Sequence, residues 1–95
     1  KFNRDAAHAQ YAELARAVLP GERFADDNAA CDRFISYMTD MVERMPFTRQ
    51  LRDVGVTESD LDMLATDAMK VERLLINNPR EMTFEAARDI YATVL

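Results

Sequence analysis

Glycine and proline are scarce in this sequence, with two Gly and three Pro in 95 residues. A sheet made of many hairpins needs frequent tight turns, and these two residues supply most of them. Their scarcity therefore favours helices joined by short connections over a β-sheet fold.

Cysteine and histidine occur once each, as Cys31 and His8. A single Cys excludes a disulfide framework, and one Cys with one His excludes a self-contained zinc site. A lone thiol fits a reducing compartment, so we expect a cytoplasmic protein. No run approaches the roughly 18 apolar residues of a membrane span, and no signal-peptide pattern is present.

An excess of positive charge is also lacking, because 17 acidic residues outweigh 12 basic ones and the net charge is −5. Binding to a nucleic-acid backbone or to an anionic membrane requires a basic surface, so neither partner is expected. The 48% of hydrophobic residues and 31% of charged residues are typical of an ordinary globular chain. We expect one helical domain over residues 1–95, without repeats or low-complexity segments.

What the sequence does contain is apolar residues at steps of three and four, which indicate helices. The expected helices cover residues 6–19, 26–45, 49–54 (a short one), 57 to 70 or 71, and 84–94. The predicted fold is all-α, a small bundle of four helices plus one short helix. The residues expected to face inward are, in chain order, Ala7, Tyr11, Leu14, Ala15, Val18, Cys31, Phe34, Ile35, Met38, Met41, Val42, Met45, Leu51, Val54, Leu61, Leu64, Ala65, Ala68, Met69, Phe84, Ala87, Ile90, Tyr91 and Val94.

Polar side chains mark where three of these helices begin. Asp26 and Thr83 stand at N-cap positions, and Thr57 with Asp60 matches a capping box in which Asp replaces the usual Glu or Gln. Phe24 precedes the first of these caps and is expected to pack on the first turn of its helix. The expected stop signals are Pro20 with Gly21, Pro46, Gly55 and Pro79.

No catalytic constellation can be assembled from these residues. His8 has no Cys or carboxylate four residues further on, so a solvent-facing side chain is expected rather than a metal ligand. Cys31 lies on an apolar stripe, which favours a buried thiol over a nucleophile. The methionines at helical spacing are expected to fill a core rather than to line a plastic peptide-binding groove.

Several short motifs resemble, in their order and spacing, the C-terminal end of the iron-containing alcohol dehydrogenase family. Residues 51–95 contain an L-x-x-x-G-V turn, a D-L pair, L-A-x-x-A and N-P-R, with I-Y near the end. Upstream, a Phe-Asn pair precedes a Y-A-x-x-A helix, as it does after the metal-binding region of that family. The chain also opens on Lys1 rather than Met, so we expect a fragment of a longer protein.

The resemblance implies a parent protein of two domains. In this family an N-terminal α/β domain binds NAD or NADP, and a C-terminal helical domain holds iron, or sometimes zinc, through one Asp and three His. The metal polarises the alcohol or aldehyde oxygen during hydride transfer. By the family pattern these ligands and the nucleotide-binding turn precede Lys1, so the resemblance implies no catalytic, metal or cofactor residue here and an inactive fragment.

One residue, Leu74, is expected at the edge of the substrate pocket, since the family's segment before N-P-R approaches that pocket. The alternative is that Leu74 only packs against neighbouring helices. The expected partner is the remainder of the parent chain, with self-association through the faces of the first two helices when it is absent. The alternative for the whole chain is a free-standing acidic helical module that binds other proteins.

Overall fold

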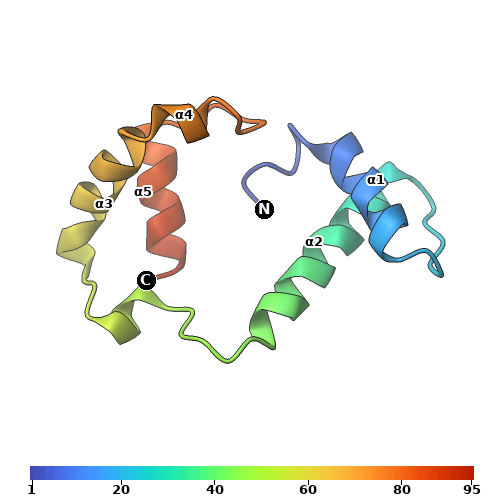
Figure 1. The fold of residues 1–95 in the computed structure, drawn as a ribbon, viewed down its shortest axis with the longest axis horizontal. Helices are drawn as coiled ribbons and strands as arrows, with labels where there is room; N and C mark the ends of the chain where they lie inside the picture. The colour runs from blue at the N-terminus through green and yellow to red at the C-terminus, as the bar shows by residue number, and fades with distance from the viewer. The chain divides into compact units, whose positions relative to one another are not determined.

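The computed structural model describes all residues from 1 to 95 and contains helices but no strand. This confirms the all-α prediction (Figure 1). The elements, in chain order, are α1 (His8–Val18), α2 (Asp27–Glu43), the 3₁₀ turns η1 (Leu51–Val54) and η2 (Glu58–Asp60), α3 (Leu61–Met69), α4 (Glu72–Leu75) and α5 (Phe84–Thr93). None of these helices has the length and apolar character required to cross a membrane.

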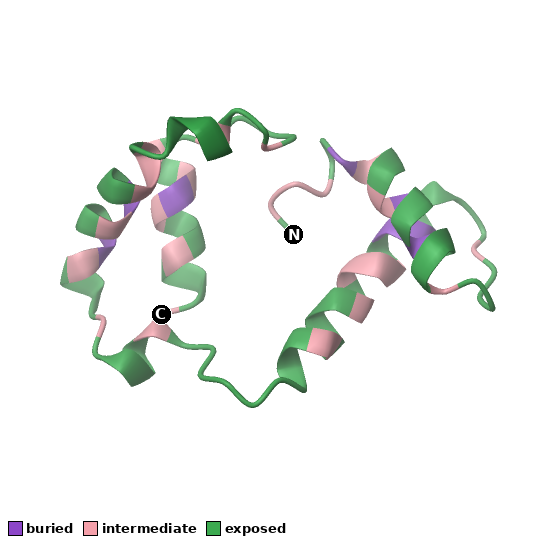
Figure 2. Cartoon of the chain, in the orientation of Figure 1, coloured by how far each residue is buried: buried purple, intermediate pink, exposed green.

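The chain divides into two compact units, Lys1–Met45 and Pro46–Leu95, called here the N-terminal unit and the C-terminal unit. Each unit has its own buried residues (Figure 2). The single domain expected over residues 1–95 stays a prediction.

The N-terminal unit is a pair of helices, α1 and α2, packed through small side chains. Its core consists of Ala12, Ala15 and Ala30, and Phe24 and Phe34 pack against it. The Phe34 ring also lies 5.4 Å, centroid to centroid, from the Tyr11 ring, with the two planes tilted by 46°. Three fully buried Ala residues allow the two backbones to approach closely, and the Phe rings add apolar contact area beside them.

The buried face of α1 differs from the predicted one. Ala12, which was not expected to face inward, is fully buried, whereas Leu14 and Val18 are 44% and 42% exposed. Spacing correctly indicates a helix, but the face that is buried depends on how closely the partner helix approaches. The small side chains of α1 lie against α2, which leaves the larger ones at the margin of the contact.

The second half of α2 and the turn after it carry an apolar stripe that no element of their own unit covers. Met38, Val42 and Met45 are exposed, although all three were expected to face inward. The helix begins where predicted, since Asp26 Oδ1 accepts a 2.8 Å hydrogen bond from the Ala29 backbone N–H. It ends at Glu43, two residues before the predicted end.

In the C-terminal unit, α3 and α5 lie side by side and bury Leu61, Ala65 and Ala87. The turn η1 is tied to the end of the chain, because the Leu51 backbone N–H donates to Val94 O at 2.8 Å. Leu51 is half-buried in this 3₁₀ turn. Val54, predicted to face inward, is instead 67% exposed, since η1 is only four residues long and packs on one side.

Ile90 and Val94 of the final segment are also more exposed than predicted. Only the side of α5 that contacts α3 is covered, and Ala87 is its one buried residue. The predicted cap of this helix is confirmed, because Thr83 Oγ1 accepts a hydrogen bond from the Ala86 backbone N–H at 3.2 Å.

The predicted helix over residues 57 to 70 or 71 is divided in the structure. It opens with η2, continues as α3 and stops at Met69, after which Val71 leaves the helical region with φ −91° and ψ 54°. The chain then forms α4, a single helical turn that was not predicted as a helix of its own. Gly55, one of the predicted stop signals, follows η1 and has φ +90°, a left-handed conformation that favours glycine.

Candidate functional site

The region around α4 is where sequence reasoning places the one candidate site residue, Leu74. Leu74 lies on α4 and is 61% exposed. Within residues 1–95 this side chain is not packed between helices. No contact in the structure tests its expected place at a substrate pocket, so that role stays a prediction.

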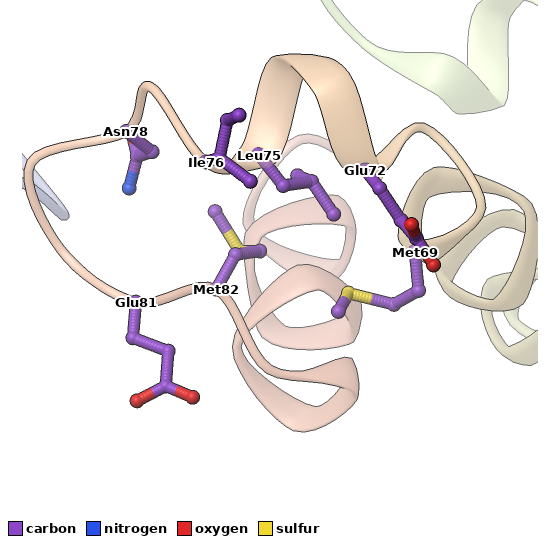
Figure 3. A pocket seen from close by; sticks show the side chains of 7 residues that line it. All are labelled: Met69, Glu72, Leu75, Ile76, Asn78, Glu81 and Met82. Carbon is purple, nitrogen blue, oxygen red and sulfur yellow. The ribbon is translucent and has the colours of Figure 1, made fainter.

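A hollow of about 460 Å³ opens beside α4. Its lining comes from the end of α3, from α4 and from the loop that leads to α5, and consists of Met69, Glu72, Leu75, Ile76, Asn78, Glu81 and Met82 (Figure 3). Leu74 is not among these residues. The exposed Leu74 and the hollow are therefore neighbouring but separate features of the same segment.

The loop beside the hollow is held by amide side chains. Asn77 Nδ2 donates to Arg73 O at 3.0 Å, and Asn78 Nδ2 donates to Arg80 O across the proline. Pro79 disfavours helical backbone at the preceding residue, so these bonds shape a turn after α4. The side chain of Asn78 thus binds backbone at the break that Pro79 predicts.

Sequence reasoning did not identify the other residues of the hollow as a group. Met69 and Met82 are thirteen positions apart and were assigned, respectively, to a helix stripe and to no element. Their meeting depends on the reversal of the chain at residues 77–80, where the N-P-R motif lies. The motif signals a break, but the spacing of the apolar residues does not reveal which of them the break brings together.

The N-terminal unit contains a second group of polar residues, around Cys31. Cys31 is fully buried, as predicted, and burial raises the pKa of its thiol. The next residue, Asp32, accepts a 2.7 Å hydrogen bond from Arg4 Nε, and this bond is the main cause of the lowered pKa of Asp32. A thiol with a raised pKa is poorly ionised near neutral pH, which is the opposite of what a cysteine nucleophile needs.

His8 is not the solvent-facing residue that the sequence predicts. It is half-buried in the first turn of α1, and its Nε2 atom is buried without a hydrogen-bond partner. The first turn of α1 lies close enough to α2 for His8 to contribute to the electrostatic environment of Asp32. The packing of α1 on α2 therefore covers a side chain whose sequence neighbours gave no reason to expect burial.

No group of three or more His, Cys, Asp or Glu side chains is arranged to hold a metal ion. The two glycines, Gly21 and Gly55, lie in different units and do not form a glycine-rich phosphate-binding turn. The structure thus consists of helices without such a metal-binding group and without such a turn.

Comparison with known families shows which family the chain belongs to. The model of the Fe-containing alcohol dehydrogenase family, C-terminal, matches residues 1–95, so the chain belongs to this family. The resemblance found in the short motifs is thereby confirmed over the whole length. No curated protein and no solved structure matches the chain. Since the iron in the name of the family has no fitting ligand set in these residues, no reaction step is assigned to them.

Proposed function

We propose that this chain is the closing part of the helical domain of an NAD(P)-dependent oxidoreductase that interconverts alcohols with aldehydes or ketones at a divalent metal. The observation that carries the proposal is the match of the C-terminal family model to all 95 residues. In this proposal the metal and the nicotinamide nucleotide are bound by other parts of the parent protein. Residues 1–95 supply structural support, and the isolated chain is inactive.

The exposed apolar surface supports the proposal that the rest of the parent chain is the partner of these residues. Met38 and Val42 on α2 and Met45 just after it form a stripe at steps of four and three residues. Such a stripe is normally covered by another element in a stable soluble protein. We place the protein in the cytoplasm, where reducing conditions suit the single free thiol of Cys31.

An activity assay tests this proposal directly. Purified residues 1–95 are mixed with Fe²⁺ or Zn²⁺, NAD⁺ or NADP⁺ and a series of primary and secondary alcohols, and nicotinamide reduction is followed by absorbance. We expect no turnover from the chain alone and turnover from the protein encoded by the complete gene. Turnover by residues 1–95 would contradict the assignment of the chemistry to the rest of the parent. Lack of activity in the complete protein, reconstituted with both metals, would contradict the oxidoreductase assignment.

A second candidate function, a free-standing protein-interaction module, is favoured by the same exposed methionines. Met side chains are flexible and polarizable, and they suit surfaces that bind several peptides. A gene that encodes nothing upstream of residue 1, together with a monomeric chain that captures a specific partner, would favour the module over the dehydrogenase part.

A further inference from the structure

The hollow beside α4 has a mixed lining in which apolar surface exceeds polar surface. Four of its seven lining residues are Met69, Leu75, Ile76 and Met82. In Figure 3 Met82 points from the loop towards α4, and the thioether of Met69 extends from α3 beneath Leu75. Ligand sites typically have volumes of about 300–1,000 Å³ and mainly apolar linings, so this hollow has the size and character of a small-molecule site.

The charged residues that line the hollow are all acidic. Glu72 and Glu81 are its only charged lining residues, and neither forms an ion pair. The two differ in direction, because the Glu72 carboxylate points towards Met69 whereas the Glu81 carboxylate points away from α4 (Figure 3). Glu72 is therefore the anionic group best placed for a ligand whose apolar part contacts Met69.

From this arrangement we infer that the hollow binds a primary aliphatic ammonium ion. The alkyl chain lies on Met69, Leu75 and Met82, and the ammonium group donates a charge-assisted hydrogen bond to the Glu72 carboxylate. A carboxylate ligand of the same length would be repelled by Glu72, and the corresponding alcohol would lack the ionic attraction. The hollow is too small for the apolar face of a whole helix, which favours a small ligand over a docked protein segment.

The methionines of the chain offer a direct readout of this binding. Met69 and Met82 line the hollow, Met63 lies on α3 outside it, and Met38, Met41 and Met45 belong to the N-terminal unit. The chain is labelled at the Met methyl groups with ¹³C and titrated with hexylammonium, hexanol and hexanoate while NMR spectra are recorded. We expect saturable shifts of the Met69 and Met82 methyl signals, with the order of affinity hexylammonium, hexanol, hexanoate.

A shorter ligand and a substitution of Glu72 make the test more specific. Because each buried CH₂ strengthens binding about fourfold, hexylammonium should bind more tightly than butylammonium by up to roughly tenfold in this open site. Replacing the exposed carboxylate in Glu72→Gln should weaken hexylammonium binding about two- to fivefold and leave hexanol binding unchanged. Glu13→Gln, which removes an exposed charge from α1, is the matched control and should alter neither.

Four outcomes would overturn the inference. They are equal affinity for hexylammonium and hexanol, an unchanged preference in Glu72→Gln, shifts centred on the methionines of the N-terminal unit, and no saturable shift at all. Circular dichroism of each variant separates loss of binding from loss of folding, and Leu75→Gln, which retains Glu72, should weaken binding of all three ligands. The test does not involve alcohol oxidation, so its result is independent of the proposed dehydrogenase function.

Discussion

Asp60 accepts two hydrogen bonds from Thr57, one from the backbone N–H and one from the hydroxyl group, both at 2.8 Å. Together they close the turn η2 and start α3. The backbone bond is the larger cause, and the hydroxyl bond the second cause, of a lowered pKa of Asp60. A residue pair three positions apart thus fixes the start of α3, the helix that packs on α5 in the C-terminal unit.

This pair predicts an acid-sensitive contribution to stability. A carboxyl group with a lowered pKa in the folded state stabilises the fold only while it is ionised. The contribution is complete above the ordinary pKa of Asp, about 3.9, and is lost as the pH falls through the lower pKa of the folded chain. The Asp60→Asn variant should therefore be less stable than the unmodified chain at neutral pH, and the difference should shrink as the pH falls below the ordinary pKa of Asp.

Urea unfolding at a series of pH values, followed by circular dichroism, measures this effect. Thr57→Val is the matched variant, because it removes the hydroxyl donor and keeps the backbone donor, so it should show a smaller pH-dependent difference. A difference between Asp60→Asn and the unmodified chain that is constant at every pH would contradict the prediction.

The closely packed core of the N-terminal unit predicts a strong effect of side-chain size at Ala15. Ala15 is fully buried between α1 and α2, and a Leu there would force the helices apart. Overpacking of this kind costs about 1–3 kcal/mol of unfolding free energy. Ala17→Leu, on the exposed side of the same helix, should change stability by less than about 0.5 kcal/mol. Equal effects of the two substitutions in urea unfolding would show that α1 does not pack on α2 through Ala15.

Burial of the single thiol predicts slow chemical labelling of Cys31. The thiol is fully buried and its pKa is raised by burial, so both access and thiolate concentration are low at neutral pH. Labelling by a disulfide reagent should be roughly ten- to a hundredfold slower than in guanidinium chloride, since the reagent must wait for local opening. Ala17→Cys in a Cys31→Ala background provides an exposed thiol on the same fold and should be labelled rapidly under both conditions.

The uncovered stripe on α2 predicts that the chain associates with itself when the rest of the parent is absent. Sedimentation velocity should show the average mass rising with concentration, because Met38, Val42 and Met45 would bury one another's apolar surface. Val42→Glu should shift the equilibrium to monomer, whereas Val54→Glu, at an exposed position of the C-terminal unit, should not. A chain that remains monomeric at the highest concentration reached would contradict the prediction.

Most of the helix boundaries could be predicted because local chemistry determines them. The caps at Asp26, Thr57 and Thr83 involve partners three residues away. Gly55 adopts a left-handed conformation because it has no side chain to oppose a positive φ. These features depend on nothing distant in the chain. The end of α3 is the exception, because residues 70 and 71 have helix-compatible neighbours and the break before α4 has no proline or glycine to signal it.

The buried faces and the candidate site were harder to predict, since they depend on contacts between distant residues. Nothing near Ala12 in sequence shows that it is buried while Leu14 is exposed. The Arg4–Asp32 and Arg88–Asp62 bonds, which span 28 and 26 positions, leave no local pattern either. The hollow beside α4 has the same origin, because its apolar residues meet only after the turn at Pro79.

The exposed position of Leu74 makes its predicted role at a substrate pocket testable without loss of the fold. Because Leu74 is 61% exposed, Leu74→Ala should change the unfolding free energy by less than about 0.5 kcal/mol. If the residue contacts substrate in the complete dehydrogenase, the substitution should change the ratio of kcat/KM between a long and a short alcohol about tenfold or more, as removal of pocket methylene groups does. Val54→Ala, at a similarly exposed position of the same unit, is the control and should preserve the ratio. A ratio unchanged in both variants would remove Leu74 from the pocket and leave it as a surface residue of α4.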